Sequence, residues 1–106
     1  MAIQIMQQQN GYSKHTYDSI FSEATIVALG KLRNIPKYLD NKPTGEIANK
    51  KMDVYFIGIG TQEIKFAFDY ELPKNYKDLS EIELINPTAL IFKNKLYVKA
   101  DGIRMV

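Results

Sequence analysis

Residues 51–69 read KMDVYFIGIGTQEIKFAFD, and this stretch decides the fold class. Two runs within it, 51–59 and 63–69, are rich in the β-branched and aromatic residues that favour strands. Residues 60–62 (Gly-Thr-Gln) separate the two runs, and glycine supplies the positive φ that a tight turn needs. The stretch therefore predicts a β-hairpin.

The second run also predicts which side of its strand packs against a core. Side chains alternate along a strand, so Ile64, Phe66 and Phe68 fall on one face and Lys65 falls on the other. This alternation is typical of a strand with one buried face and one face toward water. We expect Phe68 to be buried with the other two apolar side chains.

Further short strands flank the hairpin. Residues 24–33 predict a first strand, and residues 81–92 predict a strand broken or bent at Pro87, because proline is confined to sheet edges and bulges. Residues 96–100 alternate cleanly, and residues 103–106 predict a short last strand. The expected total is five or six strands.

The segments between these strands predict loops and short helical turns. Residues 34–49 contain two prolines, a glycine, three asparagines and an aspartate, which is the composition of a loop. A helical turn capped by Asp18 or Ser19 is expected before the first strand, and another within residues 72–79. Because no amphipathic helix of ten residues is visible, the strand pattern favours a small barrel or a sandwich.

Length and composition indicate one domain. A chain of 106 residues is long enough for one core and too short for two. Residues 1–15 are glutamine-rich and lack a period of 2 or 3.6, which predicts a flexible N-terminal arm. The single β domain is expected over residues 16–106.

Composition also narrows the class of protein. The sequence contains no cysteine, which excludes a disulfide framework, a thiolate zinc site and a cysteine nucleophile. Its first residues do not resemble a signal peptide, and no run approaches the roughly 20 apolar residues of a membrane span. We therefore expect a cytoplasmic protein with no membrane partner. The net charge of +2 permits a polyanionic partner without requiring one.

Catalytic motifs are absent from the sequence. His15 is the only histidine, and no serine or carboxylate constellation surrounds it in the sequence. The carboxylates are scattered without the spacing of a metal site. Residues 58–60 (Gly-Ile-Gly) lack the third glycine of a dinucleotide fingerprint and fit hairpin punctuation. We expect a binding protein with no enzymatic activity, no cofactor and no metal.

Outward-facing aromatic and basic side chains are the candidate nucleic-acid-binding residues. Tyr97 and Lys99 share one face of their strand, where a tyrosine can stack a base and a lysine can contact a phosphate. The other basic candidates are Lys65, Arg104, Lys31 and Arg33. Tyrosine beside lysine is equally common on strands that bind nothing, because tyrosine favours strands and lysine keeps sheet surfaces soluble.

Two segments near the end of the chain resemble a known family. Residues 82–87 read IELINP, and residues 96–103 read LYVKADGI. They resemble motifs in the small proteins of Gram-positive conjugative transposons and integrative conjugative elements that include the helicase processivity factor HelP. The resemblance is close over residues 82–103 and looser elsewhere. Gly102 stands where this family has an aspartate, and Asp18 where it has a glycine.

The resemblance implies both a fold and a function. Members of this family are regarded as OB-like or small β domains, so we expect a mainly β, five- or six-stranded antiparallel barrel of OB-like form with at most short helical turns. The implied function is an accessory factor in DNA processing, which helps a helicase unwind the element after a relaxase has nicked it. The implied partners are DNA, a helicase and a relaxase.

The alternative function is a protein-interaction adapter with no direct DNA contact. In that case the apolar residues 89–92, or the loop 34–49, would dock a helicase, a relaxase or a second copy of the chain. An anti-host factor that mimics DNA is disfavoured, because its surface would carry a marked negative charge and this chain is nearly balanced.

Overall fold

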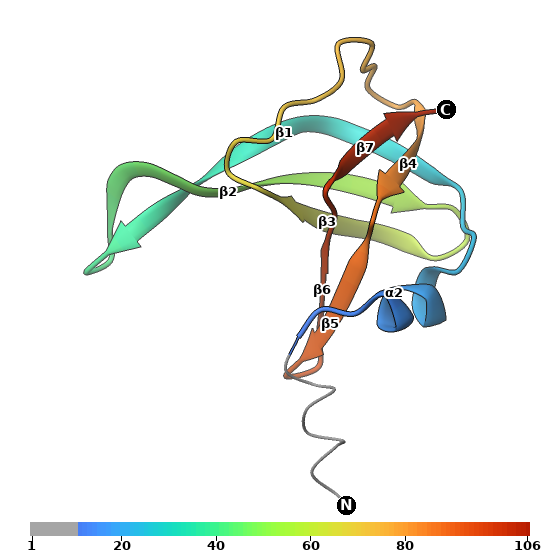
Figure 1. The fold of residues 1–106 in the computed structure, drawn as a ribbon, viewed down its shortest axis with the longest axis horizontal. Helices are drawn as coiled ribbons and strands as arrows, with labels where there is room; N and C mark the ends of the chain where they lie inside the picture. Colours follow the sequence, from blue (N-terminus) through green and yellow to red (C-terminus); the bar gives the residue numbers. More distant parts are fainter. Residues whose placement is uncertain (1–10) are drawn as a thin grey trace, which may run out of the picture.

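The computed structural model describes residues 11–106, which form one helix and one curled sheet (Figure 1). The helix is α2 (Lys14–Phe21). The strands are β1 (Ile26–Leu39), β2 (Lys42–Phe56), β3 (Gly60–Phe66), β4 (Glu81–Ile85), β5 (Thr88–Phe92), β6 (Lys95–Lys99) and β7 (Gly102–Met105). Their order in the sheet is β5-β6-β3-β2-β1-β4-β7. The mainly β prediction is confirmed.

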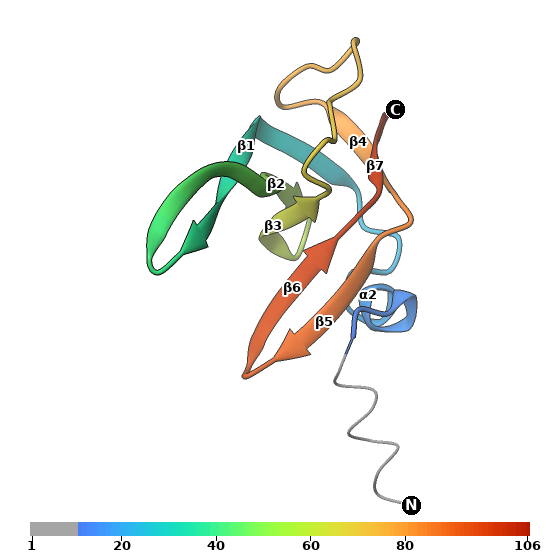
Figure 2. The same ribbon diagram turned by 60° about the vertical axis from the view of Figure 1, so that its left-hand side comes forward.

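A bent hairpin curls the sheet into a partly open barrel. β4 and β5 are two halves of one strand that bends at Asn86 and Pro87, as the sequence predicted, and β6 and β7 are two halves of the returning strand. This hairpin pairs with β3 through β6 and with β1 through β4, so it meets both edges of the β1-β2-β3 sheet (Figure 2). Counted in this way, the seven segments make five long strands of OB-like form. The β3–β6 contact is parallel, whereas an all-antiparallel barrel was expected.

The central hairpin forms, but its turn lies earlier than the sequence predicted. The turn spans residues 57–59 and is closed by the Ile59 N–H, which donates to the Phe56 carbonyl at 2.9 Å. Residues 60–62 therefore belong to β3 rather than to the turn. β3 ends at Phe66, and Phe68 is 59% exposed instead of buried, because it lies in a turn in which the chain leaves the sheet.

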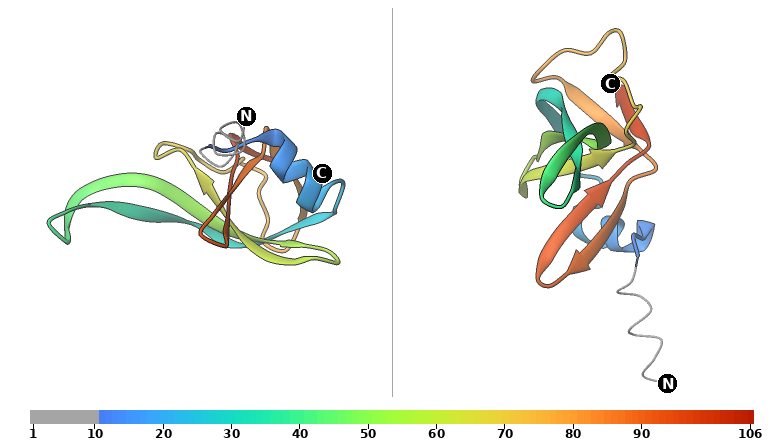
Figure 3. Two further views of the ribbon diagram at one scale, coloured as in Figure 1. Left: turned by 90° about the horizontal axis from the view of Figure 1, so that it is seen from below. Right: turned by 90° about the vertical axis from the view of Figure 1, so that its left-hand side faces the viewer.

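Residues 34–49 are not a loop. They form the outer parts of β1 and β2, a two-stranded hairpin extension that projects away from the barrel (Figure 3). The extension ends in a two-residue turn, where Asp40 and Asn41 have φ values of 53° and 65°, as in a type I′ turn. Pro36 lies at a register shift of the β1–β2 ladder, and no strand pairs with the other edge of β1 at this point. Bulges and sheet edges are the places in a sheet that accept proline.

Helix α2 closes one end of the barrel. Phe21 stacks on Phe56 with the ring centroids 3.9 Å apart, and Tyr17 packs beside them. The helix begins earlier than the sequence predicted, with Ser13 as its cap rather than Asp18 or Ser19: the Ser13 hydroxyl accepts from the Thr16 N–H at 3.0 Å. No helix in residues 11–106 has the length and apolar character that a membrane crossing requires.

The predicted N-terminal arm, residues 1–15, falls partly outside the described residues. Within them, Ser13 exchanges two backbone hydrogen bonds with Ala89 of β5, at 2.9 and 3.0 Å, and His15 lies in α2. The boundary expected at residue 16 therefore falls inside a helix that packs on the core.

The segment between β3 and β4 forms turns without a helix and fastens onto a bend in β1. Gly30 has a φ of 86° and lies at a register shift of β1. Its N–H donates to Asp78 at 2.6 Å, and its carbonyl accepts from the Tyr76 hydroxyl. These contacts satisfy both backbone groups of Gly30, which the bulge removes from the ladder.

Candidate nucleic-acid interface

Four basic side chains form a row across four neighbouring strands. Arg33 of β1 lies opposite Lys51 of β2, Lys51 lies opposite Lys65 of β3, and Lys65 lies beside Lys99 of β6. Residues in direct register share one face of a sheet. Neighbouring strands are about 4.8 Å apart, so this basic row extends roughly 14 Å perpendicular to the strands.

Carboxylates compensate one half of the basic row. Arg33 contacts Glu63 at 2.8 Å and Asp53 at 3.4 Å, and Lys51 contacts Glu63 at 3.2 Å. Within residues 11–106, Lys65 and Lys99 make no ion pair. The uncompensated positive charge of the row is therefore concentrated at its β3–β6 end.

An aromatic ring lies under these two lysines. The ammonium groups of Lys65 and Lys99 are 5.3 and 4.6 Å from the centroid of the Tyr12 ring, within the range of cation–π attraction. The hydrogen bonds between Ser13 and Ala89 hold the backbone beside Tyr12 against β5. The Tyr12 ring therefore makes cation–π contacts with both ammonium groups.

A groove of about 360 Å³ runs beside the basic row, between the β2–β3 face and the β5–β6 hairpin. Tyr12, Phe92 and Tyr97 all line it, and Phe92 is 50% exposed. The Lys95 ammonium lies 5.3 Å from the centroid of the Tyr97 ring. A second hollow of about 560 Å³ shares Asn49 and Lys65 with the groove and includes Lys99. The second hollow therefore adjoins the groove at Asn49 and Lys65.

The structure brings four of the six predicted site residues together. Lys65, Lys99 and Arg33 belong to the basic row, and Tyr97 lines the adjoining groove. Two predicted residues lie elsewhere: Lys31 is exposed at the bend of β1 and lines none of the hollows described, and Arg104 is on β7.

Arg104 belongs to a different surface. It lies opposite Glu83 of β4 and contacts its carboxylate at 3.1 Å. The hollow beside it is lined by acidic residues that include Asp18 and Glu81. Its charge is compensated there, far along the bent hairpin from Lys99.

Several residues of the interface were missed from the sequence. Tyr12 falls in the segment that was predicted to be a flexible arm, and Lys95 precedes the strand that was predicted over residues 96–100. Lys51 was missed because its place in the row depends on the register between β1, β2 and β3. Only the clustering of lysine and tyrosine around residues 95–99 gave a signal for this part of the groove.

The described residues contain no group of three or more histidine, cysteine, aspartate or glutamate side chains placed to hold a metal ion. His15 is exposed on α2.

Two tyrosines have raised pKa values. Burial, with a smaller contribution from Asp18, raises the pKa of Tyr17 to about 12, and burial with a smaller contribution from Asp78 raises the pKa of Tyr76. Neither tyrosine lines the groove.

Comparison with known proteins supports the fold. No family model matches the chain, and no curated protein matches it. A solved structure does: SAG0934 from Streptococcus agalactiae, a structural-genomics target determined by NMR in solution, is 22% identical. The match covers 84% of this chain and 87% of that one, with a TM-score of 0.62. At this identity the likeness concerns the fold alone.

Proposed function

We propose that the chain is a non-enzymatic protein that binds single-stranded nucleic acid across the face formed by β2, β3 and β6. The observation that carries this proposal is the basic row in register across four strands, with an aromatic-lined groove directly beside it. OB-type barrels bind oligonucleotides and oligosaccharides on the corresponding face. Cationic side chains next to aromatic rings favour the oligonucleotide, because each nucleotide carries a phosphate and a base.

The charge distribution favours a phosphate backbone that crosses the strands. Lys65 and Lys99 can receive a phosphate without breaking an ion pair within the described residues. The net charge of the chain is only +2, so attraction depends on this local concentration rather than on the total.

The aromatic side chains favour single strands over duplexes. Phe92 and Tyr97 line an open groove in which an unpaired base can lie against a ring. Each such stacked base stabilises a complex by roughly 1–3 kcal/mol, whereas the faces of bases in a duplex are covered by their neighbours. A single strand can therefore use both the row and the groove.

The resemblance to the conjugative-element family gives this binding a cellular role. We propose an accessory factor, acting in the cytoplasm, that helps a helicase unwind element DNA after relaxase nicking. Unwinding releases single strands, and a protein that holds one of them on its barrel face opposes their re-pairing. Helicase and relaxase are then its protein partners.

Fluorescence anisotropy with labelled single- and double-stranded oligonucleotides tests the binding. We expect single-strand binding that weakens between about 50 and 200 mM salt, because phosphate contacts release counterions. The Lys65→Ala/Lys99→Ala variant should bind roughly tenfold or more weakly at the lower salt concentration. The control is Lys74→Ala/Lys77→Ala, which removes the same charge from a segment outside the groove and should bind normally. Equal or stronger binding to the duplex would contradict the single-strand proposal.

The hairpin extension supports the adapter as a second candidate. Tyr38 and Leu39 are 62% and 68% exposed near its tip, which is the kind of surface that a protein partner covers. Residues 34–49 carry two basic and two acidic side chains, so this segment has no net attraction for a phosphate backbone. An unwinding assay separates the candidates: the adapter loses helicase stimulation in Tyr38→Ser/Leu39→Ser and keeps it in Lys65→Ala/Lys99→Ala, whereas the DNA-binding protein shows the reverse.

A further inference from the structure

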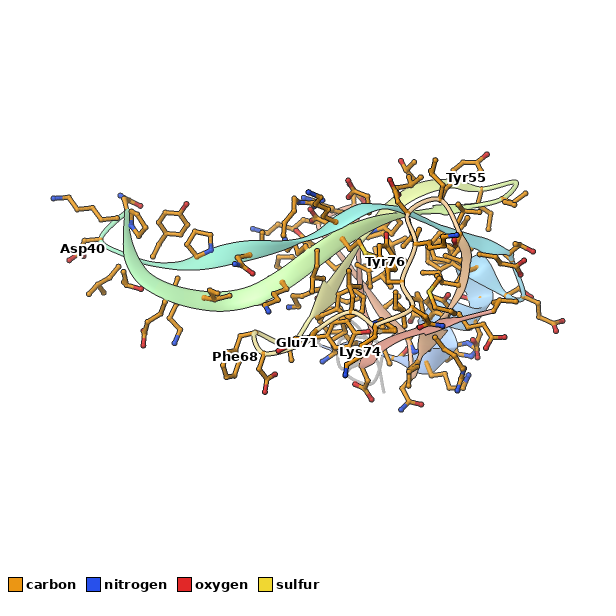
Figure 4. All side chains as sticks on the ribbon, turned by 90° about the horizontal axis from the view of Figure 1, so that it is seen from above. Asp40, Tyr55, Phe68, Glu71, Lys74 and Tyr76 are labelled. Carbon is orange, nitrogen blue, oxygen red and sulfur yellow. The ribbon has the colours of Figure 1, made fainter. Side chains whose placement is uncertain are left out.

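The Phe68 side chain is exposed to solvent, although the alternation of the strand predicted that it would be buried. It follows β3 by two residues and is 59% exposed, whereas Ile64 and Phe66 of the same run are in the core. Figure 4 shows its ring directed away from the barrel, on the side where the hairpin extension projects. The exposure results from the turn that closes after β3, in which the Tyr70 N–H donates to the Ala67 carbonyl at 3.1 Å.

Phe68 lines a third hollow, of about 450 Å³, at the root of the hairpin extension. Ile47 and Ala48 of β2 form part of its wall. Ala48 also lines the second hollow, the one that contains Lys65 and Lys99. The aromatic groove, the second hollow and this third hollow therefore follow one another along the surface, each sharing residues with the next.

We propose that Phe68 is a second base-stacking site, and that a single strand leaving the basic row continues over Ala48 onto the Phe68 ring. This inference rests on the proposed function and adds to it a longer footprint. The occupant is the same nucleic acid strand, because the path to Phe68 passes directly over the two lysines that make no ion pair within residues 11–106.

The charges along this path agree with a phosphate backbone. The second and third hollows are lined by two carboxylates and three lysines, so cations are in excess. Glu46 lies 3.8 Å from the Lys37 ammonium, whereas Asp101 accepts from the neutral Asn86 amide at 3.0 Å and keeps its negative charge. Lys65 and Lys99 at the near end are not matched by a carboxylate among the described residues. The path therefore carries two lysines where it leaves the basic row, and it ends at an exposed aromatic ring.

Binding to oligonucleotides of two lengths tests the second stacking site. OB-type domains engage roughly 4 to 16 nucleotides, so oligomers of about 4 and about 12 nucleotides cover the basic row alone and the whole path. The Phe68→Ala variant should bind the longer oligomer about fivefold or more weakly, the loss expected for one stacked base, and the shorter one normally. The matched control is Tyr38→Ala, which removes an equally exposed aromatic ring that lines none of the three hollows.

A spectroscopic measurement reports contact at this position directly. The chain contains no tryptophan, so a Phe68→Trp variant carries a single indole. Its fluorescence should be quenched by the longer oligomer and unchanged by the shorter one. Normal binding of the longer oligomer by Phe68→Ala, together with an unquenched indole, overturns the second stacking site and leaves the proposed function intact. Failure of the wild-type protein to bind either oligomer overturns both.

Discussion

Gly102, which stands where the resembling family has an aspartate, is packed against the ring of Tyr70. A Cβ placed on Gly102 would lie 2.9 Å from the ring of Tyr70. That ring cannot move away easily, because it stacks on Phe66 with centroids 4.8 Å apart and its hydroxyl accepts from the Ile103 N–H at 2.8 Å. The glycine thus gives the ring the space that an aspartate would take.

We therefore expect Gly102→Ala to lower the free energy of unfolding by about 1–3 kcal/mol, the usual result of overpacking. Urea denaturation followed by circular dichroism measures it. The control is Gly11→Ala, where a Cβ meets no atom within 4 Å, and its unfolding free energy should change by less than about 0.5 kcal/mol. Equal stability of the two variants would mean that the Tyr70 ring shifts freely.

Tyr17 makes stability depend on pH in the alkaline range. Burial, and secondarily Asp18, raise its pKa from 10.0 to about 12 in the folded state. The folded chain holds the phenolic proton more tightly, so this contribution is complete below about pH 10 and is lost between about pH 10 and 12. The free energy of unfolding should therefore fall more steeply with pH in the wild type than in Tyr17→Phe. Urea titrations of both proteins at about pH 8 and pH 11 measure the difference, and parallel pH profiles would contradict it.

At the residue scale, strand alternation predicted part of the interface and missed the rest. It places Tyr97 and Lys99 together because their side chains share a face within one strand. Tyr12 could not be found in this way, since its position depends on backbone hydrogen bonds between Ser13 and Ala89, far apart in the chain. Phe68 was misplaced because alternation carries no information about where a strand ends.

At the scale of the elements, the position of the turn between β2 and β3 decides whether the basic row forms. With a turn at residues 60–62, Lys51 would lie opposite Glu71, and no row would form. The observed turn at residues 57–59 places Lys51 opposite Lys65 instead. Composition predicts that the two strands exist, whereas the position of the turn sets their register. Gly58 and Gly60 each permit a turn, so the sequence is compatible with a turn at residues 57–59 or at residues 60–62.

The hairpin extension should be separable from the barrel. None of its residues belongs to the buried core, and an isolated two-stranded hairpin is only marginally stable. Ile35 and Asn49 are paired, so replacing residues 36–48 by Asn-Gly joins them through a type I′ turn. We expect the unfolding free energy to change by less than about 1 kcal/mol, measured by urea denaturation. A much larger loss would mean that the extension stabilises the barrel.

At the scale of the whole molecule, barrel closure brings the interface together. Arg33 and Lys51 come from the β1–β2 hairpin, and Lys99 comes from the bent hairpin near the other end of the chain. They meet because β6 pairs with β3 in parallel, and this long-range contact cannot be predicted from a local sequence pattern. The sequence could predict a small β barrel from its short strands, but not which of its charged faces would converge.

The balance of charge on this face predicts the effect of one carboxylate. Glu63 contacts both Arg33 and Lys51, so Glu63→Gln should free Lys51 and leave Arg33 paired with Asp53 alone. We expect single-strand binding to tighten roughly threefold to tenfold at about 50 mM salt, with a steeper salt dependence, because more phosphates can be contacted. Glu83→Gln is the matched control: it removes the same charge, but its partner Arg104 lies outside the groove. If both variants tightened binding equally, total charge rather than the basic row would govern the attraction; a change confined to Glu63→Gln assigns it to the row.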